Sequence, residues 1–204
     1  MTSEQVAAAM RALRVTIGVC GSVSAVAVPH IALWLRGTLG VSHIDIVATA
    51  SAARLIGLPI LEASVDGRVV TDWSTASEGR TTHVTVAERS DVLIVLPATA
   101  NFLGKVANGI ADDLLTTTLL AAACPVVIVP VMNEVMWSKP AVRRNVATLR
   151  ADGYEVVEPR DGLSLATGAR EAGSLGDFRP VIVAALTKAL TTAAAGPTAA
   201  QPPV

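Results

Sequence analysis

Short apolar runs rich in valine and isoleucine alternate along this chain with segments whose apolar residues recur at helical spacing. A run of this length and composition indicates a strand that is buried on both faces. The expected strands span residues 15–19, 44–48, 92–96, 126–129 and 154–157. Because strands that alternate with helices form parallel sheets, the sequence predicts an α/β fold with a doubly wound sheet between two helical layers.

The same spacing predicts where the helices lie. The first contains Val28, Ile31 and Leu35, and Pro29 must fall in its first turn because proline interrupts a helix further inside. Further helices are expected at residues 52–56, 82–89, 101–122, 140–152 and 179–190. Residues 59–81 are expected to form a loop with little regular structure, and residues 159–178 are glycine-rich and polar.

Length and charge limit the class of protein. A chain of 204 residues with 51% hydrophobic residues suits one core, so we expect one domain at residues 1–192. The alanine- and proline-rich residues 193–204 are expected to form a disordered tail. The 16 lysines and arginines are scattered and the net charge is −1, which argues against a nucleic-acid partner or a membrane surface. Two charge-poor stretches, 15–35 and 114–134, contain proline and are not expected to span a membrane.

Neither the first 14 residues nor the cysteine usage indicates secretion. Residues 1–14 carry charges around a short alanine run and do not resemble a signal peptide. Cys20 and Cys124 are far apart and lack the spacing of a metal site or a redox pair. We therefore expect two buried thiols in a reducing cytoplasm, and no metal.

Two unusual polar segments follow buried strands at the point where each strand ends. Pro97–Asn101 comes directly after residues 92–96, and Pro130–Trp137 follows residues 126–129. Open parallel sheets bind ligands at the carboxyl ends of their strands, so both segments are expected to border a ligand site. Asn133 could bind a carboxylate or a carbonyl there as a neutral amide, without the desolvation cost of a charge.

The turn after the first expected strand carries the pattern G-x-x-G-S-x-S at residues 18–24. Glycines let the backbone approach an anion, and the serine hydroxyls and the N–H groups of a helix start can donate hydrogen bonds to it. The pattern matches neither the dinucleotide fingerprint nor a Walker loop, so an ordinary strand-to-helix turn is the alternative. Thr49 and Ser51 end the neighbouring strand and favour phosphate binding, because they could reach the same anion.

His83 and the Asp112-Asp113 pair are the remaining candidates for acid/base work. His83 has no metal-ligand spacing to another histidine, and an isolated histidine is commonly a surface or core residue. Its place shortly before residues 92–96 favours a role in the site instead. The two aspartates could serve as paired carboxylates, but a solvated or helix-packing role is expected for them.

With these residues together, the sequence resembles the homo-oligomeric flavin-containing cysteine decarboxylase family. The likeness covers nearly all of residues 14–190 and joins separate motifs in the family's order. The motifs are Gly21-Ser22, Asp72-Trp73, His83, Pro97 to Phe102, Lys105 to Asp112 and Pro130 to Trp137.

The resemblance implies a flavodoxin-like (Rossmann-type) subunit that binds FMN. It also implies a homo-oligomer, a trimer or a dodecamer, with the flavin at a subunit interface. The implied FMN-binding residues are Gly21, Ser22, Val23, Thr49, Ser51, Thr99, Asn101 and Met136. The residues at positions 21–23, 49 and 51 would hold the phosphate and ribityl groups. Thr99, Asn101 and Met136 would lie along the isoalloxazine ring.

The resemblance also implies a reaction. FMN would oxidise the Cβ–S unit of a cysteine to a thioaldehyde, which then acts as the electron sink that lets carbon dioxide leave and gives an enethiolate. His83 would be the acid/base residue and Asn133 would hold the substrate carboxylate. The other substrate-binding positions are Met132, Thr167 and Gly168. The segment 160–178 would be a mobile clamp over the substrate.

One departure from the family pattern decides the expected subclass. Coenzyme A-pathway members carry Leu-Ala-Cys-Gly, whose cysteine helps to reduce the enethiol, where this chain has Leu165-Ala166-Thr167-Gly168. A threonine hydroxyl cannot do thiol chemistry, so the reaction is expected to stop at the oxidised aminoenethiol. Family members that stop there act on a ribosomally made precursor peptide that ends in cysteine, and their product leads to a lantibiotic-like aminovinyl-cysteine ring. Phe102 and Asp113 also depart from the family, which has threonine and asparagine there.

Three other functions stay as alternatives. The first is phosphopantothenoylcysteine decarboxylase, which Thr167 disfavours. The second is a non-catalytic flavin-binding regulatory subunit, which the presence of His83 and Asn133 disfavours. The third is a flavin prenyltransferase, which is disfavoured because the segment Pro130–Trp137 belongs to the cysteine-decarboxylating branch.

Overall fold

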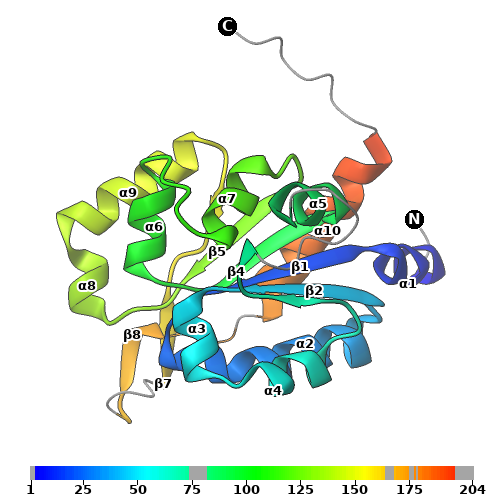
Figure 1. The fold of residues 1–204 in the computed structure, drawn as a ribbon, viewed down its shortest axis with the longest axis horizontal. Helices are drawn as coiled ribbons and strands as arrows, with labels where there is room; N and C mark the ends of the chain where they lie inside the picture. The colour runs from blue at the N-terminus through cyan, green and yellow to red at the C-terminus, as the bar shows by residue number, and fades with distance from the viewer. Residues whose placement is uncertain (1–2, 74–81, 164–167, 175–176, 178, 196–204) are drawn as a thin grey trace, which may run out of the picture.

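A six-stranded parallel sheet forms the centre of the molecule in the computed structural model, which describes residues 3–73, 82–163, 168–174, 177 and 179–195 (Figure 1). Its strands are β1 (Arg14–Val19), β2 (His43–Ala48), β3 (Val69–Val70), β4 (Val92–Ala98), β5 (Val126–Pro130) and β6 (Glu155–Val156). All neighbouring strands pair in parallel. The predicted doubly wound parallel sheet is confirmed.

The order of the strands across the sheet is β3-β2-β1-β4-β5-β6. The chain moves outward from β1 to β2 and β3, then crosses back over β1 to reach β4, so its direction reverses between β1 and β4. Without the short edge strand β3, this is the strand order of flavodoxin. In such sheets the ligand lies outside the carboxyl ends of the strands at the reversal, here the ends of β1 and β4.

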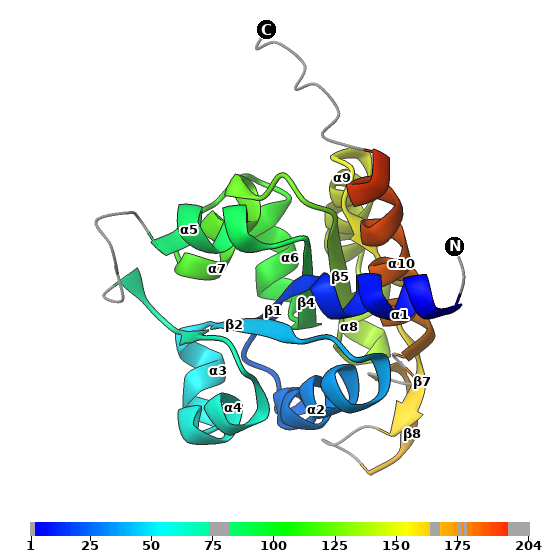
Figure 2. The ribbon, with the colours of Figure 1, turned by 90° about the vertical axis from the view of Figure 1, so that its right-hand side faces the viewer.

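Helices cover both faces of the sheet, and each face has its own apolar core (Figure 2). One core includes residues of α1 (Ser3–Ala12), α2 (Val28–Leu39), α3 (Ala50–Leu55), α4 (Leu58–Ser64) and α10 (Arg179–Ala195). The other includes residues of α5 (Thr82–Arg89), α6 (Ala100–Val106), α7 (Leu114–Ala121) and α9 (Pro140–Ala151). The sheet and the helices on its two faces make the three predicted layers.

Gly18 sets how closely α7 approaches the sheet. A Cβ atom at residue 18 would lie 2.6 Å from Cδ1 of Leu115, which is closer than carbon atoms can pack. Leu115 itself is buried. A glycine in the middle of β1 therefore lets the first turn of α7 lie directly on the central strand, next to the carboxyl edge.

The helix predicted over residues 101–122 is wrong in its middle. α6 ends at Val106, and α7 begins only at Leu114. Gly109 takes a left-handed conformation, with φ 67°, that stops the first helix. Asp113 then starts the second helix through a capping box, in which its side chain accepts from Thr116 N and Thr116 Oγ1 accepts from Asp113 N. The apolar periodicity continues through this break, and for that reason the spacing alone does not reveal it.

The loop predicted at residues 59–81 is also wrong in part, because α4 and β3 lie within it. Pro59 stands at the start of α4 and Pro29 at the start of α2, where proline is tolerated, and the expectation for Pro29 is confirmed. α1 was not expected. α10 continues to Ala195, into the segment predicted as a tail, whose residues 196–204 lie outside the described residues.

Two smaller elements lie near β6 in the chain, one before α9 and one after β6. The helix α8 (Glu134–Ser138) follows β5, and an antiparallel hairpin is formed by β7 (Arg160–Leu163) and β8 (Arg170–Ser174), which contacts α8. The predicted clamp at 160–178 includes this hairpin, but its connecting residues 164–167 lie outside the described residues, so the clamp stays a prediction. In the described part of the chain, no helix has the length and apolar character needed to cross a membrane.

Candidate functional site

A cavity of about 450 Å³ opens at the carboxyl edge of the sheet. Its lining comes from the segments that follow β1, β2 and β4, together with residues of α6 and the start of α7. The lining residues are Cys20, Gly21, Thr49, Ala50, Ser51, Thr99, Asn101, Phe102, Lys105 and Asp113. The cavity therefore lies at the reversal of strand order, where a doubly wound sheet binds its ligand, and its volume is within the range of cofactor sites.

Close contact between the β1 loop and α3 shapes one wall of this cavity. A Cβ atom at residue 21 would overlap Cβ of Ser51, so only glycine lets the two segments approach this closely. The amide of Cys20 donates to the carbonyl oxygen of Pro97 at 3.2 Å, which ties the same loop to β4. Gly21 itself lines the cavity.

Three hydroxyl side chains start the short helices around the cavity. Ser22 Oγ accepts from Ser24 N at 3.3 Å, Thr49 Oγ1 from Ala52 N at 3.2 Å, and Thr99 Oγ1 from Phe102 N at 3.3 Å. In each case the oxygen is the acceptor, so the hydroxyl hydrogens of Ser22 and Thr49 are left to donate to a ligand, whereas the side chain of Thr99 also hydrogen-bonds with Cys20. Thr49 and Thr99 line the cavity, and Ser22 follows the lining residue Gly21.

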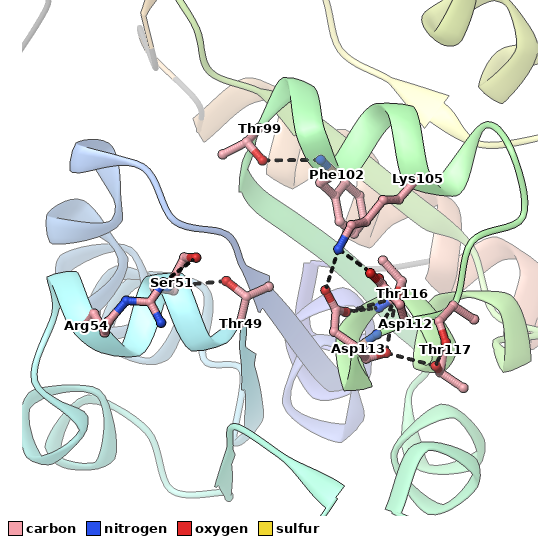
Figure 3. Close-up of polar contacts among 12 residues, drawn as sticks. Thr49, Ser51, Arg54, Thr99, Phe102, Lys105, Asp112, Asp113, Thr116 and Thr117 are labelled. Atoms are coloured by element: carbon pink, nitrogen blue, oxygen red, sulfur yellow. Dashed lines mark hydrogen bonds and ion pairs between the residues drawn. The ribbon is translucent and has the colours of Figure 1, made fainter.

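The charged residues in the lining, Lys105 and Asp113, belong to one cluster on the α6–α7 side (Figure 3). Lys105 Nζ lies 2.7 Å from Asp112 Oδ1 and 3.7 Å from Asp113 Oδ2. The hydrogen bond to Asp112 raises the pKa of Lys105 and lowers the pKa of Asp112. The lysine charge is therefore compensated within the protein. The capping box at Asp113 confirms a helix-packing role for that aspartate.

Cys20 lies in the lining as a neutral thiol. Burial raises its pKa to about 12, so it carries no thiolate at neutral pH and cannot act as a nucleophile. Burial also raises the pKa of Cys124 to about 11. Cys20 is buried as predicted, whereas Cys124 is only partly buried, and neither forms a disulfide. Among the described residues there is no group of side chains that could hold a metal ion.

His83 stands in the first turn of α5 and contacts Trp73. The two ring centres lie 5.4 Å apart with the planes at 78°, an edge-to-face arrangement. Nδ1 of His83 is buried and has no hydrogen-bond partner among the residues that the structure describes, and the same holds for Oγ1 of the neighbouring Thr82. A buried imidazole nitrogen without a partner is costly unless a ligand uses it. His83 is not part of the cavity lining within one chain.

Asn133 follows β5 and begins α8. Its Oδ1 accepts from Met136 N at 2.8 Å, which fixes the orientation of the amide. The NH2 group therefore points away from the helix, and no partner binds it among the described residues. Met132 is buried, whereas Asn133 and Met136 are exposed. Like His83, none of the three is part of the cavity lining.

The structure thus brings together some of the predicted site residues and leaves others apart. The cavity lining contains Gly21, Thr49, Ser51, Thr99 and Asn101. Ser22 and Val23 continue the same loop outside the lining. Gly168 is exposed with a left-handed φ of 71°, and Thr167 lies outside the described residues.

Sequence reasoning missed five lining residues as site members: Cys20, Ala50, Phe102, Lys105 and Asp113. Phe102, Lys105 and Asp113 lie in or directly after motifs already quoted for the family resemblance, which could have marked them. Ala50 lies between two predicted residues. Cys20 carries no sequence signal beyond its place before the glycine-serine turn.

This fold and cavity define a parallel α/β protein with a polar, cofactor-sized site at its switch point. The profile of the family described as Flavoprotein matches residues 3–188, so the chain belongs to the flavoprotein family. It is 54% identical to a solved structure described as the FMN-dependent cysteine decarboxylase SpaF, with a TM-score of 0.80, over 88% of this chain and 98% of that one. The predicted family is thereby confirmed.

Two curated relatives extend the comparison. Mersacidin decarboxylase of Bacillus sp. (strain HIL-Y85/54728) is 35% identical over 78% of this chain and 80% of its own length. The coenzyme A biosynthesis bifunctional protein CoaBC of Bacillus subtilis (strain 168) is 44% identical over 59% of this chain. The match spans only 30% of that bifunctional protein, so the chain corresponds to about a third of its length.

Proposed function

We propose that this chain is an FMN-dependent enzyme that oxidatively decarboxylates the C-terminal cysteine of a ribosomally made precursor peptide. One observation carries the proposal: a polar cavity of cofactor size lies at the switch point of a chain that aligns with 98% of an FMN-dependent cysteine decarboxylase. The similarity to mersacidin decarboxylase supports a peptide as the substrate.

The residues around the cavity fit FMN. Only glycine at residue 21 lets the β1 loop lie directly against Ser51, and both residues line the cavity. The hydroxyl hydrogen of Thr49 is free to donate to a ribityl or phosphate oxygen, because its oxygen accepts from Ala52 N. FMN, when bound, supplies the two-electron acceptor that oxidation of a cysteine side chain requires.

His83 is the proposed acid/base residue. Its partnerless Nδ1 can take or return a proton, and the edge-to-face contact with Trp73 holds the ring in one orientation.

Asn133 is proposed to hold the substrate carboxylate through its free amide hydrogens. The capping bond to Met136 N fixes which end of the amide faces the substrate. A neutral amide orients the carboxylate without the strong ground-state stabilisation that an arginine would give, and this favours loss of carbon dioxide. Met132, Met136, Thr167 and Gly168 are the proposed neighbours of the bound substrate and ring.

His83 and Asn133 lie outside the lining of the cavity within one chain, so we propose a homo-oligomer in which a second copy completes each site. A trimer and a dodecamer both meet this requirement. Exposed apolar residues on the chain segments that also supply lining residues support such an interface: Val23, Val26, Leu55 and Ile110.

The runner-up activity is decarboxylation of phosphopantothenoylcysteine, which the similarity to the coenzyme A protein favours. Thr167 argues against it, because that reaction returns electrons to its intermediate with the help of a cysteine at this position. The expected product is therefore the oxidised one, with carbon dioxide and two hydrogen atoms lost.

The purified, flavin-loaded protein should be incubated with a peptide ending in cysteine and, separately, with phosphopantothenoylcysteine. We expect the peptide to lose the mass of carbon dioxide plus two hydrogens. Loss of carbon dioxide alone from phosphopantothenoylcysteine would establish the runner-up. Tight FMN binding with neither substrate turned over would point to a regulatory flavoprotein and overturn the proposal.

A further inference from the structure

The two sides of the cavity differ in charge. On the α6–α7 side the charge of Lys105 is balanced by Asp112 and Asp113. On the α3 side a guanidinium, that of Arg54, stands one helical turn after the lining residue Ser51 (Figure 3). A dianionic ligand group in this cavity would have a compensated cluster on one side and, on the other, a cation that forms no ion pair within the described part of the chain.

A hydrogen bond ties Arg54 to the cavity-lining residue Ser51. Its Nη2 donates to Ser51 Oγ at 3.0 Å, an i to i+3 contact on α3. No carboxylate in the described part of the chain forms an ion pair with this guanidinium. The remaining N–H groups are therefore available, and they lie in the planar fork that matches phosphate oxygens.

The same hydrogen bond prepares Ser51 as a second donor. Because Ser51 Oγ accepts from Arg54, its own hydrogen must point elsewhere, and Ser51 lines the cavity. The hydroxyl of Thr49 lines the cavity from the same loop and is likewise free to donate, since its oxygen accepts from Ala52 N. Two hydroxyl donors in the lining, with Arg54 bonded to one of them, thus stand on the α3 side of the site.

We propose that Arg54, positioned by Ser51, recognises the phosphoryl group of the flavin and makes the cavity select FMN over riboflavin. This inference rests on the proposed flavin cofactor and deepens it, because it assigns the phosphoryl group to the α3 side of the cavity. Arg54 was not among the residues expected to bind the cofactor, and it is not part of the lining itself. Arg54 is linked to the site by its hydrogen bond to Ser51.

The test compares the affinities of two ligands for two variants. Dissociation constants of FMN and of riboflavin are measured on flavin-free protein by quenching of flavin fluorescence. R54Q is expected to weaken FMN about tenfold, the effect of losing one charge-assisted hydrogen-bonding partner, and to leave riboflavin unchanged. R144Q serves as the matched control, because it removes the same charge from an exposed position on α9.

Salt dependence gives a second readout that a merely structural role of Arg54 would not change. FMN binding to the unaltered protein should weaken as ionic strength rises, and R54Q should lose most of this dependence. R54K keeps the charge without the fork and should restore the salt dependence with only part of the affinity.

The outcomes separate this inference from the proposed function. Equal weakening of FMN and riboflavin in R54Q, or the same weakening of FMN in R144Q, would overturn the role of Arg54 while FMN remained the cofactor. An unaltered protein that binds neither flavin would overturn the proposed function, and the inference with it.

Discussion

Single atoms decide whether the cavity can take its ligand, and Gly21 is the clearest case. Its missing Cβ is what allows the β1 loop to touch Ser51. G21A should therefore push the two segments apart and weaken FMN binding at least about tenfold, since displaced cavity walls lose several hydrogen bonds together. The dissociation constant of FMN is the measurement.

Gly37 provides the control for this substitution. It lies inside α2, where an added Cβ would meet no atom within 4 Å. G37A should leave FMN affinity unchanged and stabilise the helix by about 0.5–1 kcal/mol. If G21A bound FMN as tightly as G37A does, the close approach at Ser51 would have no part in cofactor binding.

His83 decides turnover rather than cofactor binding. Removing the partnerless imidazole should lower kcat at least about a hundredfold, the usual effect of losing a positioned acid or base. Because His83 is outside the cavity lining, FMN affinity should stay the same in H83N. H30N, an exposed change on α2, should keep full activity. Undiminished turnover in H83N would remove this residue from the mechanism.

At the scale of elements, the apolar runs were sufficient to predict the parallel sheet, because four of its strands are almost wholly buried and rich in branched residues. β3 was not predicted, because its two residues are too few to form an apolar run. The break between α6 and α7 was not predicted either, since one left-handed glycine and one capping aspartate interrupt an apolar stripe that otherwise continues.

The same break explains which part of the site could be predicted. Thr49, Ser51 and Thr99 follow strands directly, so strand ends place them at the cavity. Lys105 and Asp113 come together only because the chain turns between the two helices. The link from Arg54 to Ser51 depends on rotamers, which a linear pattern does not contain.

The start of β1 is fixed to the loop before β4 by an ion pair whose strength depends on pH. Arg14 donates to both oxygens of Asp91, at 2.7 Å to Oδ1 and 3.1 Å to Oδ2, and its amide donates at 2.8 Å. Burial alone would raise the pKa of Asp91, but the hydrogen bonds from Arg14 outweigh it and lower the pKa. The pair therefore stabilises the fold above the unfolded pKa of about 4, and this contribution is lost as the pH falls further.

D91N should consequently reduce the free energy of unfolding by about 1 kcal/mol at neutral pH, a value that allows for solvent screening of this half-exposed pair. The difference from the unaltered protein should shrink as the pH falls below about 4, because protonated Asp91 resembles asparagine. Urea unfolding at a series of pH values measures it. A difference that persisted unchanged at low pH would mean that the charge of Asp91 contributes nothing.

At the scale of the whole molecule, the proposed homo-oligomer requires an interface, and we propose that exposed apolar side chains near the lining residues in sequence form it. Val23 and Val26 are 57% and 62% exposed on the turn after Ser22, and Leu55 is 58% exposed on the helix of Ser51. Apolar side chains gathered beside a cofactor cavity are a common mark of an interface. A charge placed among them should separate the copies.

V26D should therefore lower the molar mass measured by light scattering and release FMN, because the cavity loses its cover. L120D adds the same charge at an exposed position near the end of α7, while the cavity borders the start of that helix, so it should retain both the assembly and the flavin. The assembly and the retained flavin should fall together as V26D is diluted, since one contact supports both. An unaltered chain that is monomeric and still holds FMN tightly would contradict the shared site, and His83 and Asn133 would then have to reach the flavin within one chain.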